Sequence, residues 1–530
     1  MIEFRSLAFA ACATLALTLP VRAETPGDTL VIADAIDDIV SLDPAESFEF
    51  SGEDALQNVY DRLVQIVPAH NFQLEPGLAE SWSASPDGKT FTFKLKDGLK
   101  FQSGNPITAD DAAWSLQRAV KLNKTPAFIL TQFGFTADNV DQLIKATGPL
   151  ELQITTDKAY AQSFFYNILT SIVGSVVDKK EVMTHEANGD FGYEWLKTHA
   201  AGSGPYGLRS WKPNDSIILE AAGGKYWGGD VALKRVFIRH VPEGATRRLL
   251  LEKGDIDIAR RLTPGDVEAI SANGDLKVQN DQKGRIFYLA GNQKVEALAK
   301  PQVREALKYL IDYDGMANSF LKGQMVVHQG FLPEGFLGAI TDKPYKFDVA
   351  KAKSLLAEAG YPDGFSVTMA VRNDPIRVDM AQAIQNTLAQ AGIKVEINAT
   401  TGAEELNAYR ARQHQLILES WGPDYPDPQT NASTFAANPD NADTAKNAGY
   451  LAWRTAYDAK DTNAMVDAAV VEQDTTKRKA MYEDMQRLAQ KVSPFTWLFQ
   501  ETEQIGERKN VNGFSSGGAV SSAFYWTVTK

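Results

Sequence analysis

The sequence predicts an α/β protein with more than one domain, built from mixed sheets flanked by helices. Its 530 residues exceed the roughly 250–300 that one hydrophobic core usually serves, so we expect two or three domains. Short runs that alternate apolar and polar residues are bounded by Asp-Gly pairs, which is typical of strand hairpins. Later in the chain, helical periodicity and strand alternation follow one another, which indicates α/β packing.

The chain opens with the features of a secretory signal peptide. Met1 to Arg5 carry charge, residues 7–19 are almost all apolar, and Val21-Arg22-Ala23 offers small residues for cleavage before Glu24. The apolar run is shorter than the roughly 20 residues that span a bilayer. We therefore expect residues 1–23 to be removed and a mature chain that begins at Glu24 to be exported to the periplasm.

Cys12 is the sole cysteine of the sequence. Ala10-Ala11-Cys12 resembles the start of a lipid-attachment motif, which is the alternative to cleavage after Ala23, but Phe9 stands where leucine is usual. Cleavage after Ala23 removes the thiol, and we therefore expect no disulfide, thiolate metal site or cysteine nucleophile in the mature chain.

Charge and histidine spacing exclude several classes of function. Removing residues 1–23 changes the formal charge from −13 to −14, and such a surface repels phosphate backbones. Nucleic acid and anionic lipid are therefore poor partners. The six histidines show no short metal-binding spacing, so we expect neither a metal site nor a cofactor.

Local patterns predict the elements in chain order. Phe91-Thr-Phe-Lys-Leu alternates between the turns Asp87-Gly88 and Asp97-Gly98, which predicts hairpin strands. A helix should begin after Thr108, a good N-cap, because acidic residues follow and Trp114, Leu116 and Val120 have helical spacing.

The second half of the chain predicts alternating helices and strands. Residues 349–359 carry an apolar stripe before Gly360, and residues 377–391 precede Gly392, which predicts two helices that end at glycine. Ile393-Lys-Val-Glu-Ile then alternates as a strand does, and Leu416-Ile-Leu predicts a further strand.

Two short motifs resemble those of enzymes but stand in the wrong context. Gly202-Ser-Gly-Pro-Tyr-Gly207 begins like a phosphate-binding loop, yet Pro205 removes a donor and a strand-turn-strand pattern follows. A structural glycine turn is the better interpretation. Gly513-Phe-Ser-Ser-Gly517 matches G-x-S-x-G, but it lacks the strand before and the helix after that a nucleophile elbow needs. We expect no catalytic residue from either motif.

The most unusual segment is Glu419-Ser-Trp-Gly-Pro-Asp-Tyr-Pro-Asp-Pro428, whose prolines forbid a regular helix or strand. One interpretation is a surface turn in which Asp424 and Asp427 are turn formers beside proline. The other is a rigid loop at a strand end that presents a carboxylate and two aromatic rings to a cleft, where ligands of open α/β sheets bind. Composition alone favours the turn.

A series of short motifs runs in order along nearly the whole mature chain. They are Ser41-Leu-Asp-Pro-Ala45, Leu78-Ala-Glu-Ser-Trp82, Asp97-Gly-Leu-Lys-Phe101, Gly104-Asn-Pro-Ile-Thr-Ala-Asp-Asp111, Gly202-Ser-Gly-Pro-Tyr206, Tyr226-Trp227, Gly254-Asp-Ile-Asp257 and Val303-Arg-Glu-Ala306. In this order the set resembles the extracellular solute-binding proteins of family 5, the dipeptide- and oligopeptide-binding receptors of bacterial ABC importers.

The resemblance implies a two-lobed clamp with the ligand cleft between the lobes. One lobe is built from both ends of the chain and carries an extra subdomain, and the other is continuous. The chain should cross between the lobes near residues 288–292 and 497–504. The expected ranges are 24–65, 201–288 and 500–530 for lobe I, 66–200 for the subdomain and 289–499 for lobe II.

The resemblance also implies the residues that bind the ligand. Asp424 stands where the family has an aspartate that holds the free amino group of a bound peptide. Arg372 aligns with the arginine that receives the peptide carboxylate in dipeptide-selective relatives, and Arg377 is the alternative because the loop length differs there. The aromatic walls are expected from Trp421, Tyr425, Phe48 and Phe50, although each ring could instead belong to a core.

The expected function is that of a monomeric receptor. It captures a dipeptide or short peptide, closes around it, delivers it to ABC permease subunits at the inner membrane, and catalyses nothing. An alternative keeps the fold and the transport role with an opine, glutathione, an oligosaccharide or another non-peptide ligand. A remote alternative is a secreted hydrolase, which would need a nucleophile or a carboxylate pair in the cleft.

Overall fold

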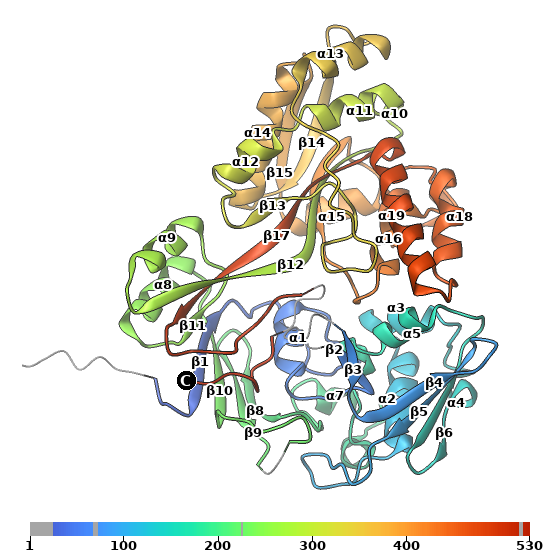
Figure 1. The fold of residues 1–530 in the computed structure, drawn as a ribbon, viewed down its shortest axis with the longest axis vertical. Coiled ribbons are helices and arrows are strands. Elements are labelled where there is room, and N and C mark those ends of the chain that lie inside the picture. Colours follow the sequence, from blue (N-terminus) through green and yellow to red (C-terminus); the bar gives the residue numbers. More distant parts are fainter. Residues whose placement is uncertain (1–24, 67–72, 224–225, 519–522) are drawn as a thin grey trace, which may run out of the picture.

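The computed structural model describes residues 25–66, 73–223, 226–518 and 523–530. The expected signal peptide at residues 1–23, with Cys12, and the expected new N-terminus at Glu24 lie outside the described residues. Two groups of elements face one another across a pair of long strands (Figure 1), which confirms a two-lobed α/β fold. We keep lobe I, the subdomain and lobe II as names for the ranges expected from the sequence, and their boundaries stay a prediction.

One mixed sheet runs through both lobes. Its order is β15-β14-β16-β12-β17-β11-β1-β10-β9-β8, and β13 pairs with β17. The strands are β1 Thr29–Asp34, β8 Tyr206–Lys212, β9 Ser216–Ala221, β10 Arg235–His240, β11 Ile258–Ala259, β12 Leu276–Gly291, β13 Met325–Val327, β14 Ser366–Arg372, β15 Lys394–Thr400, β16 Leu416–Trp421 and β17 Phe495–Arg508. The antiparallel strands β12 and β17 are the longest, and the expected crossovers fall on or beside them.

Lobe I packs a core on each face of its part of the sheet. β1 pairs in parallel with β10 and β11, and all of its residues are buried because both faces of the strand are covered. Leu30 and Ile32 join the core on one face. Val31 and Ala33 join the core on the other, which α8 (Gly244–Lys253) and α9 (Pro264–Ala272) cover.

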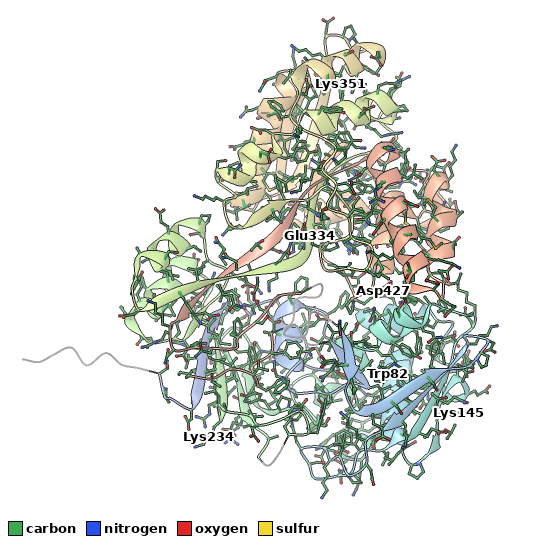
Figure 2. The ribbon with its side chains drawn as sticks, viewed as in Figure 1. Trp82, Lys145, Lys234, Glu334, Lys351 and Asp427 are labelled. Carbon is green, nitrogen blue, oxygen red and sulfur yellow. The ribbon has the colours of Figure 1, made fainter. Side chains whose placement is uncertain are left out.

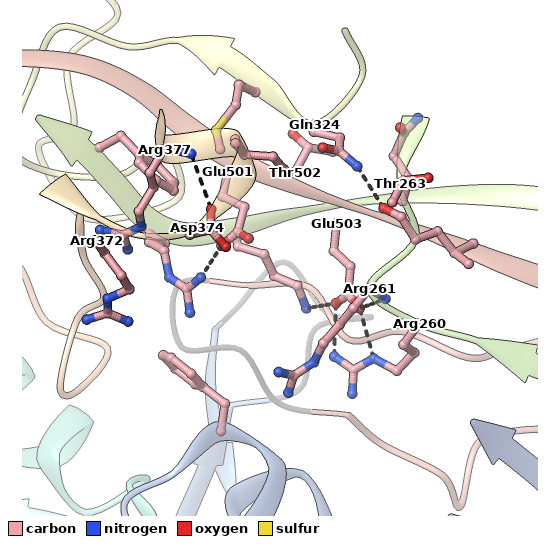
Figure 3. A pocket seen from close by; sticks show the side chains of 18 of the residues that line it. Arg260, Arg261, Thr263, Gln324, Arg372, Asp374, Arg377, Glu501, Thr502 and Glu503 are labelled. Atoms are coloured by element: carbon pink, nitrogen blue, oxygen red, sulfur yellow. Dashed lines mark hydrogen bonds and ion pairs between the residues drawn. The ribbon is translucent and has the colours of Figure 1, made fainter. Parts of the chain in front are cut away.

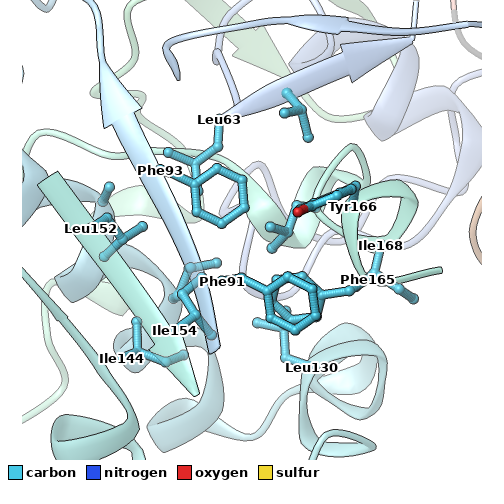
Figure 4. Close-up of a cluster of buried hydrophobic side chains, with 14 of the residues drawn as sticks. Leu63, Phe91, Phe93, Leu130, Ile144, Leu152, Ile154, Phe165, Tyr166 and Ile168 are labelled. Carbon is cyan, nitrogen blue, oxygen red and sulfur yellow. The ribbon is translucent and has the colours of Figure 1, made fainter. Parts of the chain in front are cut away.

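The subdomain is built on a separate antiparallel sheet with the order β4-β5-β7-β6. Its strands are β4 Ala79–Ala84, β5 Thr90–Leu95, β6 Ile144–Gly148 and β7 Glu151–Thr155, and β2 Val64–Ile66 pairs with β3 Leu74–Pro76 nearby. Gly88 has a φ of +69° in the turn between β4 and β5, as the Asp-Gly signal predicts. Phe91 of β5 stacks on Phe165 with ring centroids 3.9 Å apart, at the centre of the core in Figure 4.

Helix α2 (Ala109–Leu122) begins as the sequence predicts. The Thr108 hydroxyl accepts a hydrogen bond from the Asp111 backbone N–H, and the Asp111 carboxylate accepts one from the Thr108 backbone N–H, which completes a capping box. The Asp97-Gly98 turn was expected to join two strands of a hairpin. The structure instead places an isolated bridge, between Lys100 and Pro106, after this turn.

Lobe II follows the predicted alternation of helices and strands. α13 (Val349–Glu358) ends just before Gly360, whose φ is +92°, and α14 (Pro375–Ala389) is followed by Gly392 and β15. β14 pairs in parallel with both β15 and β16. The carboxyl ends of these strands therefore meet at one edge of the sheet.

The remaining helices surround these sheets. They are α1 Phe50–Leu56, α3 Phe128–Thr131, α4 Val140–Leu143, α5 Gln162–Ile168, α6 Lys179–Val182, α7 Tyr193–Leu196, α10 Glu296–Ala299, α11 Pro301–Tyr309, α12 Tyr313–Asn318, α15 Gly402–Arg410, α16 Gln429–Ala436, α17 Leu451–Arg454, α18 Lys460–Ala469 and α19 Thr475–Val492. Of the helices in the described ranges, none combines the length and the apolar character needed to cross a membrane.

The two enzyme-like motifs are structural. A Cβ atom at Gly202 would lie 2.0 Å from the Val59 carbonyl oxygen, so the glycine is needed for close backbone packing before β8. Residues 513–517 form a loop with no helix in the described residues that follow. Both placements agree with the predicted interpretation.

Candidate functional site

A cavity of about 430 Å³ lies between the lobes, beside the two crossing strands (Figure 3). This volume suits a small ligand. α1 contributes Phe50 and Asp54 to its wall, β12 contributes Arg285, and the start of α14 and the end of β14 contribute Arg377 and Arg372. Residues of both lobes and of the crossing strands therefore surround one space.

Arg372 and Arg377 both line this cavity, but their surroundings differ. Arg377 forms an ion pair with Glu419 and donates a hydrogen bond to the Ser420 hydroxyl at 2.7 Å. Its backbone N–H bonds Asp374, the N-cap of α14. Its guanidinium is therefore already held by the protein.

Arg372 is the freer of the two arginines. Its side chain is 42 % exposed, and the carboxylate of Glu419, which is already paired with Arg377, lies 3.9 Å from its guanidinium. The side chain rests against Gly402, where a Cβ atom would lie 2.7 Å from Arg372 Nε. Of the two expected carboxylate receptors, Arg372 is therefore the one whose guanidinium is less engaged by the protein.

Asp424 lies just after β16, in the proline-rich loop. It is half-buried, its backbone N–H donates to the Thr430 hydroxyl at 3.1 Å, and that hydroxyl is 3.5 Å from the carboxylate. Burial raises the pKa of the Asp424 carboxyl to about 7, against the lowering effects of the Thr430 hydrogen bond and the Arg454 charge. A nearby ligand cation would therefore favour the ionised carboxylate.

Glu53 of α1 is a second acidic group close to Asp424. Burial and the like charges of Asp54, Glu49 and Asp424 raise the pKa of its carboxyl to about 8, although Arg62 opposes this shift. Since α1 belongs to lobe I and Asp424 to lobe II, the two lobes bring acidic groups toward the same region.

The expected aromatic walls fall into two groups. Phe50 lines the cavity and touches the Asp424 loop, since a Cβ atom at Gly422 would lie 3.1 Å from Phe50 Cζ. Trp421 is half-buried against the hydrophobic cluster that contains Tyr288 and Phe435. Its Nε1 is buried without a hydrogen-bond partner among the described residues. Phe50 therefore lies between the cavity and the Asp424 loop, whereas Trp421, like Asp424 itself, is not among the described residues that line the cavity.

Phe48 and Tyr425 are placed differently from the expectation. Tyr425 is only 3 % exposed and its ring lies 5.9 Å from that of Phe164 in the subdomain. Phe48 packs edge-on against Phe128 at 5.9 Å. Neither ring lines the described cavity, because both are taken up by packing against the subdomain core.

Asp427 is more than a turn former. It is fully buried and forms two short contacts with the equally buried Arg478, at 2.6 and 2.8 Å. Arg478 also donates to the hydroxyl of Ser163 in α5, 3.1 Å away. This ion pair therefore lies where lobe II meets the subdomain, as the position of Asp427 in Figure 2 shows.

Sequence reasoning missed Glu53, Arg285 and Arg478. Arg285 had a usable signal, because it is a charge placed at the start of the apolar run of residues 286–291, close to an expected crossover. No local signal identifies Glu53 or Arg478, because their partners come from distant parts of the chain. Across the described ranges, no group of three or more His, Cys, Asp or Glu side chains is arranged to hold a metal ion.

Relatives of known name match nearly the whole chain. The probable D,D-dipeptide-binding periplasmic protein DdpA of Escherichia coli (strain K12) is 29% identical over 515 residues, which cover 96% of each chain. The glutathione-binding protein GsiB of Shigella dysenteriae serotype 1 (strain Sd197) is 25% identical over 480 residues and 89% of each chain.

Solved structures share the fold. The periplasmic binding protein DppA of Helicobacter pylori, in complex with the peptide STSA, is 25% identical with a TM-score of 0.78, covering 94% of this chain and 98% of its own. CtaP of Listeria monocytogenes, at 20% identity, superposes with a TM-score of 0.81 over 95% of this chain and 99% of its own. The model of the bacterial extracellular solute-binding proteins, family 5 Middle, matches residues 73–443, so the chain belongs to the family 5 extracellular solute-binding proteins.

Proposed function

We propose that this protein is the periplasmic receptor of an ABC importer, and that it captures a dipeptide or other short peptide between its lobes. The observation that carries the proposal is the placement of Asp424 and Arg372 at the carboxyl ends of the neighbouring parallel strands β16 and β14. A zwitterionic peptide offers one ammonium and one carboxylate group, which match these two charges.

Asp424 is the proposed receptor of the ligand's ammonium group. Its raised pKa means that the protein alone stabilises the charged carboxylate poorly. A ligand ammonium supplies the missing positive partner, and the contact becomes a charge-assisted hydrogen bond in a partly desolvated place.

Arg372 is the proposed receptor of the ligand's carboxylate. Its guanidinium faces the cavity, the acid 3.9 Å away, Glu419, is already paired with Arg377, and its contact with Gly402 restricts where it can lie. A planar guanidinium binds a carboxylate through two parallel hydrogen bonds. Fixed charges at both ends favour peptides whose charge separation matches the site.

The names of the relatives agree with this assignment. They include a probable D,D-dipeptide-binding periplasmic protein and a structure in complex with a peptide, and the family consists of solute-binding proteins rather than enzymes. We therefore propose export to the periplasm after loss of residues 1–23, action as a monomer without catalysis, and delivery of the peptide to ABC permease subunits in the inner membrane.

A thermal-shift screen of purified residues 24–530 tests the proposal. A ligand that binds only the folded clamp stabilises it by about 2.7 kcal/mol when present at about 100 times its Kd. We expect the Tm to rise with members of a dipeptide library. Shifts with only opines, glutathione or oligosaccharides would contradict the peptide assignment, and release of product from any peptide would contradict the absence of catalysis.

A further inference from the structure

Arg285 lies at an irregular point of β12 that turns it toward the cavity. Between the pairs Gln282↔Thr502 and Ile286↔Gln500, β12 contains residues 283–285 where β17 contains only Glu501. Such bulges redirect side chains. Arg285 is 34 % exposed and lines the cavity together with Arg372.

The guanidinium of Arg285 is oriented but weakly paired. Its Cζ lies 5.4 Å from the centre of the Phe50 ring, a distance that allows a cation–π contact. Its acidic neighbour is Glu501, at 3.4 Å and 28 % exposed. A partly exposed pair at this distance contributes little, so the guanidinium can accept another anion at low cost.

Other cations of the cavity wall are occupied. Arg260 forms ion pairs with Asp54 and Glu503, and Lys283 lies 2.8 Å from the same Glu503 carboxylate. Arg261 pairs with Asp34 at 2.9 Å. Arg377 is held by Glu419, as described above.

The acids of the wall are occupied in the same way. Asp54 and Glu503 neutralise Arg260 and Lys283, and Asp374 caps α14. Glu501 is thus the acid of the wall that pairs with Arg285, and Glu419, the acid near Arg372, is already paired with Arg377. If Arg372 takes the ligand's main-chain carboxylate, Arg285 still attracts a second anionic group.

We propose that Arg285 is a specificity-determining residue that selects peptides with a second carboxylate at the carboxyl end, meaning a C-terminal glutamate or aspartate. This inference rests on the proposed peptide-binding function. Arg285 binds the side-chain carboxylate of the peptide, whereas Asp424 and Arg372 bind the two ends of the peptide main chain.

Calorimetric titration with Ala-Glu and Ala-Gln tests the inference, because the two dipeptides have nearly the same shape and differ by one charge. A hydrogen bond to a charged group predicts that the wild type binds Ala-Glu about ten- to a hundredfold more tightly than Ala-Gln. Arg285→Gln should abolish this preference and leave the affinity for Ala-Gln within about threefold.

A matched arginine serves as control. Arg235 is 51 % exposed on lobe I and pairs with Glu220 at 3.0 Å, so Arg235→Gln should keep the full preference. Thermal denaturation of both variants verifies that they fold. Arg285→Lys, which retains the charge, should restore part of the preference.

Each other outcome counts against the inference. Equal binding of Ala-Glu and Ala-Gln to the wild type, or an unchanged preference in Arg285→Gln, would overturn the role of Arg285 and leave the proposed function intact. Failure of the wild type to bind either dipeptide, in a protein whose Tm responds only to non-peptide ligands, would overturn the proposed function and the inference together.

Discussion

Replacement of Asp424 by asparagine tests the proposed ammonium site most directly. The change removes the charge, nearly keeps the shape, and leaves Thr430 able to bond the side chain. Loss of one partner of a desolvated charge pair costs about 2–5 kcal/mol. Because Asp424 is half-buried, we expect the lower end of this range, about 2 kcal/mol, which raises Kd about 30-fold.

The same substitution should stabilise the unbound protein at pH 8. Folding raises the pKa of the Asp424 carboxyl from 3.8 to about 7, so the folded state binds more protons than the unfolded state between these pH values. The free energy of unfolding therefore falls as the pH rises through this window, and the full penalty applies above pH 7. Asparagine carries no such penalty, so its Tm should exceed that of the wild type at pH 8 and approach it near pH 4.

The assay is calorimetric titration at pH 8 with a dipeptide that stabilises the wild type and with its N-acetylated form. Acetylation removes the ammonium charge, so it should weaken binding to the wild type much more than binding to Asp424→Asn. Asp484→Asn is the control, because that side chain is 71 % exposed in lobe II. Wild-type affinity in Asp424→Asn, or an equal effect of acetylation on both proteins, would refute the ammonium role.

Further predictions follow from the same contacts. Below pH 7, the Kd of that dipeptide should rise by up to about tenfold per pH unit as Asp424 becomes protonated; a flat profile from pH 5 to 8 would contradict this. Arg372→Gln should weaken peptide binding with little change in Tm, whereas Arg377→Gln should lower the Tm because it leaves Glu419 unpaired; titration and melting curves distinguish the two. Asp427→Asn should destabilise the protein by about 3–5 kcal/mol in urea denaturation, because it breaks a buried ion pair. N-terminal sequencing of exported protein should begin at Glu24, and a lipid-modified Cys12 would contradict cleavage there.

The sequence predicted the elements whose signals are local. Thr108 and Asp111 cap α2 by contacts three residues apart, and Gly360 follows α13 with the positive φ that glycine adopts readily. Both depend on neighbours within one turn, so a single sequence contains the necessary information. The order of the family motifs added the two-lobed arrangement, which no local signal specifies.

The site was less predictable, because distant partners determine what each charge is free to do. By sequence, Arg372 is the first candidate and Arg377 the alternative, and no local signal shows that Glu419 pairs with Arg377. Tyr425 was an expected cleft wall, but Phe164, from the subdomain, buries it. Pairings across such separations depend on the assembled lobes.

Protein atoms alone make the junction between lobe II and the subdomain. The Ala161 N–H donates to the Val470 carbonyl at 2.9 Å, the Gln473 side chain donates to the Tyr160 carbonyl at 2.7 Å, and Arg478 donates to the Ser163 hydroxyl at 3.1 Å. None of these contacts includes a ligand group, so under the proposed function they contribute equally whichever solute is bound. A ligand shifts a conformational equilibrium only through its own differential affinity. Selectivity among peptides would then come from the groups proposed to bind the ligand, Asp424 and the cavity arginines.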